Sequence, residues 1–295
     1  MSRIISKPLS KYPGSCRLKY FVISLAGILG FLAFPQAETN AQGDLMITPR
    51  RVVFDGSKRS MDLNLANTGQ DTATYAISLV QIRMTEDGGF ETITDPDPDQ
   101  RFADRFIRFF PRSVTLGPNE AQVVKVQLTR SNELTPGEYR SHFYFRAVPK
   151  IKPLGEEGAP VDSSTISVRL TPVFGITIPV IIRNGETSVK VTLSDLLLEL
   201  VNDTIPRISM VFNRTGNISV YGDITVDHIS TQGRITRVGI ANGIAVYTPN
   251  TSRRFLFNLN RVTGVDFRTG TLRVIYSAPS DVKPLRYAEA ELALN

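Results

Sequence analysis

The sequence predicts an all-β fold of two β-sandwiches, and three of its features carry that prediction. Short runs rich in Val, Ile, Phe, Tyr and Thr alternate with polar residues, as expected of strands with one buried face. Clusters of Gly, Pro, Asn and Asp separate these runs at the spacing typical of an antiparallel sandwich. Helix patterns are nearly absent. With 295 residues and a 41% apolar share, the chain can build two cores of ordinary size.

The N-terminal segment has the features of a secretory signal. Five basic residues precede an apolar run at 20–34, and the small residues Thr39 and Ala41 follow it at the spacing of a cleavage site. We therefore expect residues 1–41 to be a signal peptide cleaved after Ala41. An uncleaved anchor is the alternative, which the shortness of the run disfavours because a membrane span needs about 20 residues. Cys16 precedes the run, whereas a lipoprotein cysteine follows it.

Export changes the charge of the protein. The whole chain has 34 basic and 28 acidic residues and a formal net charge of +6. Residues 1–41 hold five of the basic residues and one of the acidic residues, so the exported chain keeps 29 and 27, a net charge of +2. This small excess removes the reason to expect a nucleic-acid partner. No other stretch approaches the length of a membrane span, so we expect no stable membrane insertion after signal cleavage.

The composition also argues against metal, cofactor and enzyme chemistry. The single cysteine lies in the predicted signal peptide, which excludes a disulfide scaffold and a multi-cysteine metal site. The two histidines, His142 and His228, lie in no catalytic motif. The acidic run 95–99 has the spacing of a calcium loop but lacks its glycine and its final acidic residue. We therefore expect no metal, no cofactor and no enzymatic activity; an exported hydrolase is the remaining catalytic alternative.

The first domain is predicted to span residues 42–183. Turn signals such as Asp55-Gly56, Gly117-Pro118 and Pro136-Gly137 divide it into strand-like runs. Strands are expected at 46–54, 60–66, 73–84, 106–116, 121–129 and 138–148.

The second domain is predicted to span residues 184–295, beginning at the turn signal Asn184-Gly185. The leucine run 196–198 is compatible with a helix as well as a strand. Strands are expected at 188–200, 206–213, 218–228, 234–240, 243–248, 253–260, 271–277 and 286–293.

One segment, 166–182, is unusual because every even position in it is apolar or proline. Side chains of a strand alternate between faces, so this pattern predicts a strand with a continuous apolar row. Its 17 residues far exceed the usual length of about five or six. Pro172 and Pro179 lack the N–H that a central strand needs, which favours an edge position. The apolar row then either packs into the protein's own core or binds another chain, since an exposed apolar edge strand tends to pair with a further strand.

The chain resembles the PapD-like periplasmic pilus chaperones in several stretches that occur in order. They are RVVFDGS at 51–57, FIRFFP at 106–111, VVKV at 123–126 and PGEYRS at 136–141. The resemblance covers residues 44–183 throughout, and it continues more weakly over 184–295 through YGDI at 221–224. It implies two immunoglobulin-like domains set as a boomerang.

The resemblance also implies a function, a location and partners. Such chaperones work in the periplasm, where their G1 edge strand completes a pilus or fimbrial subunit that lacks one strand, and they deliver the subunit to an outer-membrane assembly platform. Here the G1 donor strand corresponds to 166–182. Self-association through this edge is a further possibility. The side chains expected to enter the client are Ile166, Val168 and Leu170, with Pro172 and Phe174 as further candidates.

The family anchors the C-terminal carboxylate of its client with one arginine and one lysine. The arginine corresponds to Arg51, whose planar guanidinium suits a carboxylate. The lysine is expected near 175–177, where this chain has Gly-Ile-Thr and no basic residue. A structural or adhesive two-domain β-sandwich surface protein, or a fibre subunit, is the alternative function. A subunit would lack a strand, whereas this sequence has a full set and an additional donor.

The donor-strand hypothesis predicts how charged substitutions at Val168 and Leu170 will behave. Val168→Glu and Leu170→Glu should abolish co-purification of clients and leave the thermal unfolding temperature nearly unchanged, because these side chains face the client. Unfolding of the variants would show instead that both residues belong to the protein's own core.

Overall fold

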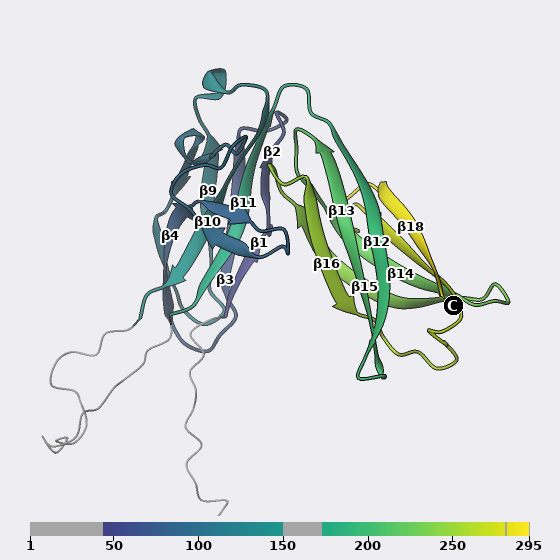
Figure 1. Cartoon of the computed structure of the whole chain (residues 1–295). Helices are drawn as coiled ribbons and strands as arrows, with labels where there is room; N and C mark the ends of the chain where they lie inside the picture. The colour runs from purple at the N-terminus through teal and green to yellow at the C-terminus, as the bar shows by residue number, and fades with distance from the viewer. Residues whose placement is uncertain (1–43, 150–172, 281, 295) are drawn as a thin grey trace, which may run out of the picture. The chain divides into compact units, whose positions relative to one another are not determined.

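The computed structural model describes residues 44–149, 173–280 and 282–294 (Figure 1). In this part of the chain the regular structure is strands and two single-turn 3-10 helices, Asp104–Phe106 and Ser131–Glu133, which confirms the all-β fold. No helix among the described residues is long and apolar enough to cross a membrane. The predicted signal peptide lies outside the described residues, as do Ile166, Val168, Leu170 and Pro172.

The first sandwich consists of two sheets, and most neighbouring strands within each sheet are not consecutive in sequence. The four-stranded sheet has the order β1 (Leu45–Thr48), β3 (Ser60–Asn67), β9 (Ala121–Leu128) and β7 (Ile107–Phe110). The five-stranded sheet has the order β2 (Val52–Phe54), β11 (Gly175–Asn184), β10 (Gly137–Ala147), β4 (Ala73–Val80) and β8 (Ser113–Leu116).

Alternate residues of both sheets form the core of this sandwich. Phe143 of β10 is fully buried, and its ring meets that of Phe109 of β7 edge to face at 5.1 Å. Leu63 of β3 and Val124 of β9 are also fully buried in this cluster. The alternation of apolar and polar residues in the sequence therefore indicates which face of each strand points into the core.

The second sandwich is built in the same way from later strands. Its three-stranded sheet has the order β12 (Val189–Val201), β13 (Ile205–Gly216) and β16 (Ser252–Asn258). Its four-stranded sheet has the order β15 (Ile235–Val246), β14 (Val220–Ile229), β17 (Gly270–Ser277) and β18 (Arg286–Leu294). The long strands β12 and β13 run side by side in Figure 1. The rings of Phe212 and Tyr276 meet in its core at 5.0 Å.

Two predicted strands are each divided at a proline. The run predicted at 46–54 forms β1 and β2, which belong to different sheets and are separated at Pro49. The run predicted at 106–116 forms β7 and β8, separated at Pro111. Proline has no N–H for a ladder, so the chain leaves one sheet at each of these points and joins the other.

Other strand predictions were wrong in detail. The runs predicted at 234–240 and 243–248 form one strand, β15, because Ala241 continues the pairing with β14. The run predicted at 73–84 ends at Val80, and β5 (Ile82–Met84) pairs with the unpredicted β6 (Phe90–Thr92) in a hairpin.

The helical alternative for 196–198 was also wrong. These leucines lie in β12, where Leu196 falls within a register shift between Ser194 and Leu197 and the other two follow it. Asp195 takes a φ of 53° at this irregularity, which is the left-handed backbone region that a bulge can use.

The described part of the apolar row packs into the protein's own core. The row shares one face of β11, where Ile178, Val180 and Ile182 are buried in the cluster of the first sandwich. Ile176 is partly buried against the same cluster. Phe174 precedes β11 and is 49% exposed. For 176–182 the row therefore faces inward, while its earlier part up to Pro172 lies outside the described residues.

Substitutions at the two ends of this row should differ in their effect on stability. Ile182→Ala should lower the free energy of unfolding by about 2–5 kcal/mol, because it leaves a cavity in a closed core. Phe174→Ala should change it by less than about 0.5 kcal/mol, because that side chain is half exposed. Urea unfolding followed by circular dichroism measures both, and equal losses would contradict this division of the row.

Candidate functional site

The first part of the candidate site is a free edge on β11. On one side β11 pairs with β10 from Gly175 to Asn184. On the other side β2 pairs in parallel with Val180, Ile181 and Ile182 alone. Within the described residues, the stretch 175–179 therefore has no strand beside it on that side.

The backbone groups of this edge point outward at alternate residues. The Ala147 N–H donates to the Phe174 carbonyl at 2.9 Å, so Phe174 directs its backbone groups toward β10. In an antiparallel pair the two groups of one residue point the same way, and the direction alternates along the strand. Gly175, Thr177 and Pro179 thus direct their backbone groups toward the free edge. Pro179 lacks an N–H, and none is required of it there.

A groove of about 590 Å³ lies along this edge, between β1 and β11. Its walls are mainly apolar side chains, among them Leu45, Ile47, Ile176 and Ile178. Arg50 lines this groove and also lines a second cavity. The two cavities are therefore neighbours that share one residue.

The second cavity, which we name the arginine pocket, has a volume of about 590 Å³ and is lined by Arg50, Arg51 and Arg183. None of the described residues that line it is acidic. Two of these arginines come from neighbouring strands of the first sandwich. Arg51 directly precedes β2, and Arg183 is the penultimate residue of β11. An anion is the ligand that this charge favours.

Two tyrosines of the second sandwich hold Arg51. Its Nη1 donates to the hydroxyl of Tyr247 at 3.0 Å. Its guanidinium lies 4.0 Å from the ring centroid of Tyr221. The cation–π contact and the hydrogen bond together orient the guanidinium.

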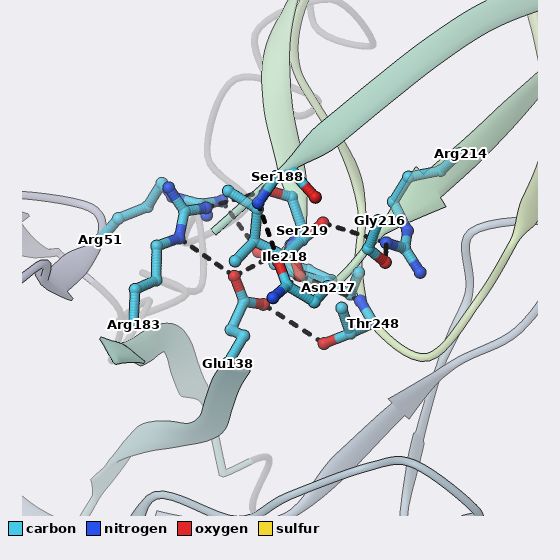
Figure 2. A network of polar contacts seen from close by, with 11 residues as sticks. Arg51, Glu138, Arg183, Ser188, Arg214, Gly216, Asn217, Ile218, Ser219 and Thr248 are labelled. Carbon is cyan, nitrogen blue, oxygen red and sulfur yellow. Dashed lines mark hydrogen bonds and ion pairs between the residues drawn. The ribbon is translucent and has the colours of Figure 1, made fainter. Parts of the chain in front are cut away.

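Glu138 holds Arg183. Figure 2 shows the side chains of Arg51 and Arg183 converging beside Ser219, with Glu138 below them. The Nε of Arg183 donates to Oε2 of Glu138 at 3.1 Å, and its Nη2 donates to the Ser219 carbonyl at 2.8 Å. Arg183 is thereby fixed at two points, one on each sandwich.

The Glu138 carboxylate is satisfied by groups of the second sandwich. Its side chain is 0% exposed. Oε2 also accepts the Ser219 N–H at 2.9 Å, and Oε1 accepts the hydroxyls of Ser219 and of Thr248, the latter at 3.3 Å. A buried carboxylate needs such a set of donors and a cation. The network therefore connects β10 and β11 to the second sandwich at the arginine pocket.

The two predicted site residues that the structure describes, Arg51 and Phe174, lie in different places. Arg51 lies in the arginine pocket, and Phe174 lies just before the free edge of β11. No basic residue occurs at 175–177, and the Tyr144 ring occupies the space beside Gly175, where an added Cβ would lie 2.2 Å from Cε2.

Arg183 is the functional residue that the sequence reasoning missed. The signal was present in the alternation, because Ile181 and Arg183 share the face of β11 opposite to the apolar row. The alternation alone could not show that this face meets the second sandwich.

His142 lies buried next to the same region. It is 3% exposed, and its ring meets that of Tyr247 at 6.2 Å and that of Phe90 at 6.1 Å. Burial lowers the pKa of His142 from 6.5 to about 3, and the nearby charges of Arg140 and Arg51 act in the same direction. The imidazole is therefore neutral at physiological pH.

Comparisons with known proteins show similarity in architecture. No protein-family model matches the sequence, and no curated protein matches it. Among solved structures, the YadV chaperone is 14% identical, with 85% of this chain and 100% of that chain aligned and a TM-score of 0.43. A chain of the CsuC–CsuE chaperone–tip adhesion subunit complex of Acinetobacter baumannii is 11% identical over 84% and 98%, with a TM-score of 0.42. The Pseudomonas aeruginosa CupB2 chaperone is 15% identical over 85% and 100%, with a TM-score of 0.41.

The chain is therefore similar in fold to solved chaperones of pilus and fimbrial systems.

The buried His142 predicts a pH dependence of stability. Its pKa is 6.5 in an unfolded chain and about 3 in the fold, so between these values the unfolded chain binds the proton and the fold does not. Stability should therefore fall as the pH falls through this range, by up to about 1.4 kcal/mol per pH unit from this residue. Urea unfolding measured from about pH 7 down to about pH 3.5 should show a shallower loss of the free energy of unfolding in His142→Gln than in the wild type. An equally steep loss in the variant would show that His142 is not responsible.

Proposed function

We propose that the protein is a periplasmic chaperone that binds an exported pilus or fimbrial subunit by adding its β11 edge strand to the incomplete sheet of that client. The free edge of 175–179 beside an apolar groove is the observation that carries this proposal. No covalent chemistry is part of it. Main-chain hydrogen bonds along the edge would supply affinity, and side chains entering the groove would supply specificity.

The arginine pocket supports a direction for the added strand. The groove and this pocket share Arg50, and β11 runs from the free edge at Gly175 toward Arg183. A C-terminal carboxylate would be held between Arg51 and Arg183, with the second arginine in the place of the family's lysine. A client strand that ends there runs parallel to β11, as β2 does.

Burial of apolar side chains should supply most of the binding free energy. The donor side chains proposed from the sequence are Ile166, Val168 and Leu170, and burial of each contributes roughly 1.5–3 kcal/mol. Each hydrogen bond along the edge adds about 1 kcal/mol. Ordering of the donor segment opposes these gains, so a client must bury several donor residues at once.

A backbone substitution at the free edge tests strand addition. Thr177→Pro removes an N–H that points away from β10, so it should weaken client capture at least about tenfold, which corresponds to about one hydrogen bond and some disturbance of its neighbours. Thr177→Val keeps the N–H and is the matched control. Capture is measured as the yield of client co-purified from the periplasm, identified by mass spectrometry, with thermal unfolding as the check on folding. Equal capture by a folded Thr177→Pro variant and by wild type would refute pairing at this edge.

A further inference from the structure

The arginine pocket has more surface than a carboxylate can use, and the additional surface is apolar. Val53, Val189 and Val282 line it together with the arginines. Val282 is 51% exposed, and Val53 and Val189 are partly buried. These three valines and the three arginines line the same cavity, so that together they form an amphipathic wall of aliphatic and cationic groups.

We propose that this wall is a subsite for the side chain of the client's last residue, and that it selects an apolar one. The inference rests on the proposed function, because it takes the client to end in the arginine pocket. The ligand class is a polypeptide C-terminus that combines a free carboxylate with an aliphatic or aromatic side chain.

The chemistry of a C-terminal residue fits this arrangement. The carboxylate and the side chain leave the same Cα, so a site that binds both needs a cationic surface next to an apolar one. Arg51 and Arg183 come from the first sandwich, and Val189 begins β12 of the second. The cationic half therefore comes from the first sandwich, and the aliphatic half comes from both, since Val53 lies on β2.

Tyr287 of β18 also lines the arginine pocket. Its ring is partly buried against Tyr276, with the centroids 5.2 Å apart. Burial raises the pKa of Tyr287, and the charges of Arg183 and Arg51 oppose that rise. Its ring adds aromatic surface to the lining of the pocket, and its hydroxyl is a hydrogen-bond donor of the kind that a carboxylate oxygen accepts.

The same features disfavour other last residues. A basic side chain would meet the like charges of Arg50, Arg51 and Arg183. Glycine would leave the valines uncovered. An acidic side chain would compete with the terminal carboxylate for the arginines and would not cover the apolar surface.

Four small probes test the subsite on the protein purified from the periplasm. They are N-acetyl-leucine, N-acetylglycine, N-acetylaspartate and N-acetyl-leucinamide, which mimic a last residue with and without its side chain or its charge. Nuclear magnetic resonance of the arginine Nε–H groups reports the dissociation constant of each probe. N-acetyl-leucine should bind at least about tenfold more tightly than N-acetylglycine or N-acetylaspartate, and the amide should not bind measurably.

Variants assign the two halves of the subsite. Arg51→Gln should weaken all three acids. Val282→Gln should reduce the preference for N-acetyl-leucine over N-acetylglycine to less than about threefold and leave the affinity for N-acetylglycine unchanged. Val123→Gln changes another exposed valine, on β9, and should have no effect on any probe.

The outcomes separate the inference from the function on which it rests. Acids that bind with no preference for leucine, or with a preference for aspartate, would overturn the apolar subsite and keep the carboxylate site. Arginine resonances that no acid shifts, or that the amide shifts equally, would overturn both the carboxylate site and the subsite. Strand addition at β11 would then still be judged separately, by the Thr177→Pro experiment.

Discussion

The buried carboxylate of Glu138 is the constraint on which the candidate site depends. It has no exposure to solvent, so it requires a cation and several donors in fixed positions. Arg183 supplies the cation from the neighbouring strand, and Ser219 and Thr248 supply donors from the second sandwich. Loss of one partner of such a buried pair typically costs about 3–5 kcal/mol. The requirement of one carboxylate thus holds β10, β11 and the second sandwich together.

The same requirement gives the arginine pocket its form. Arg183 is held on one side by Glu138, and Arg51 is held on the other by Tyr247 and Tyr221. Two guanidinium groups repel each other, and they stay adjacent because each has its own partner. A small apolar cluster that contains Ile181 and Tyr247 adjoins Arg51 through Tyr247. A ligand anion would therefore meet cations that are already in position, which lowers the cost of binding it.

Sequence and structure agree where local patterns decide the outcome. The alternation of apolar residues predicted nearly all strands, because a strand with one buried face must alternate. The predictions failed where neighbours decide: Pro49 sends β1 and β2 to different sheets, and Ala241 keeps β15 continuous through a glycine-containing run. Arg51 was found through a motif, whereas Arg183 was not, since its significance lies in residues such as Glu138 and Ser219 that are distant in sequence.

The sequence by itself determined the all-β fold, its division into two sandwiches and the near-neutral charge of residues 42–295, because these follow from composition and local periodicity. Only the tertiary structure decided that the apolar row of β11 faces inward over 176–182 and that the edge of β11 is free before Val180. It also decided that Arg51 and Arg183 share one pocket. The physical reason is that a strand pattern specifies two faces, while the partner of each face, and of each edge, depends on which other strands the fold brings beside it.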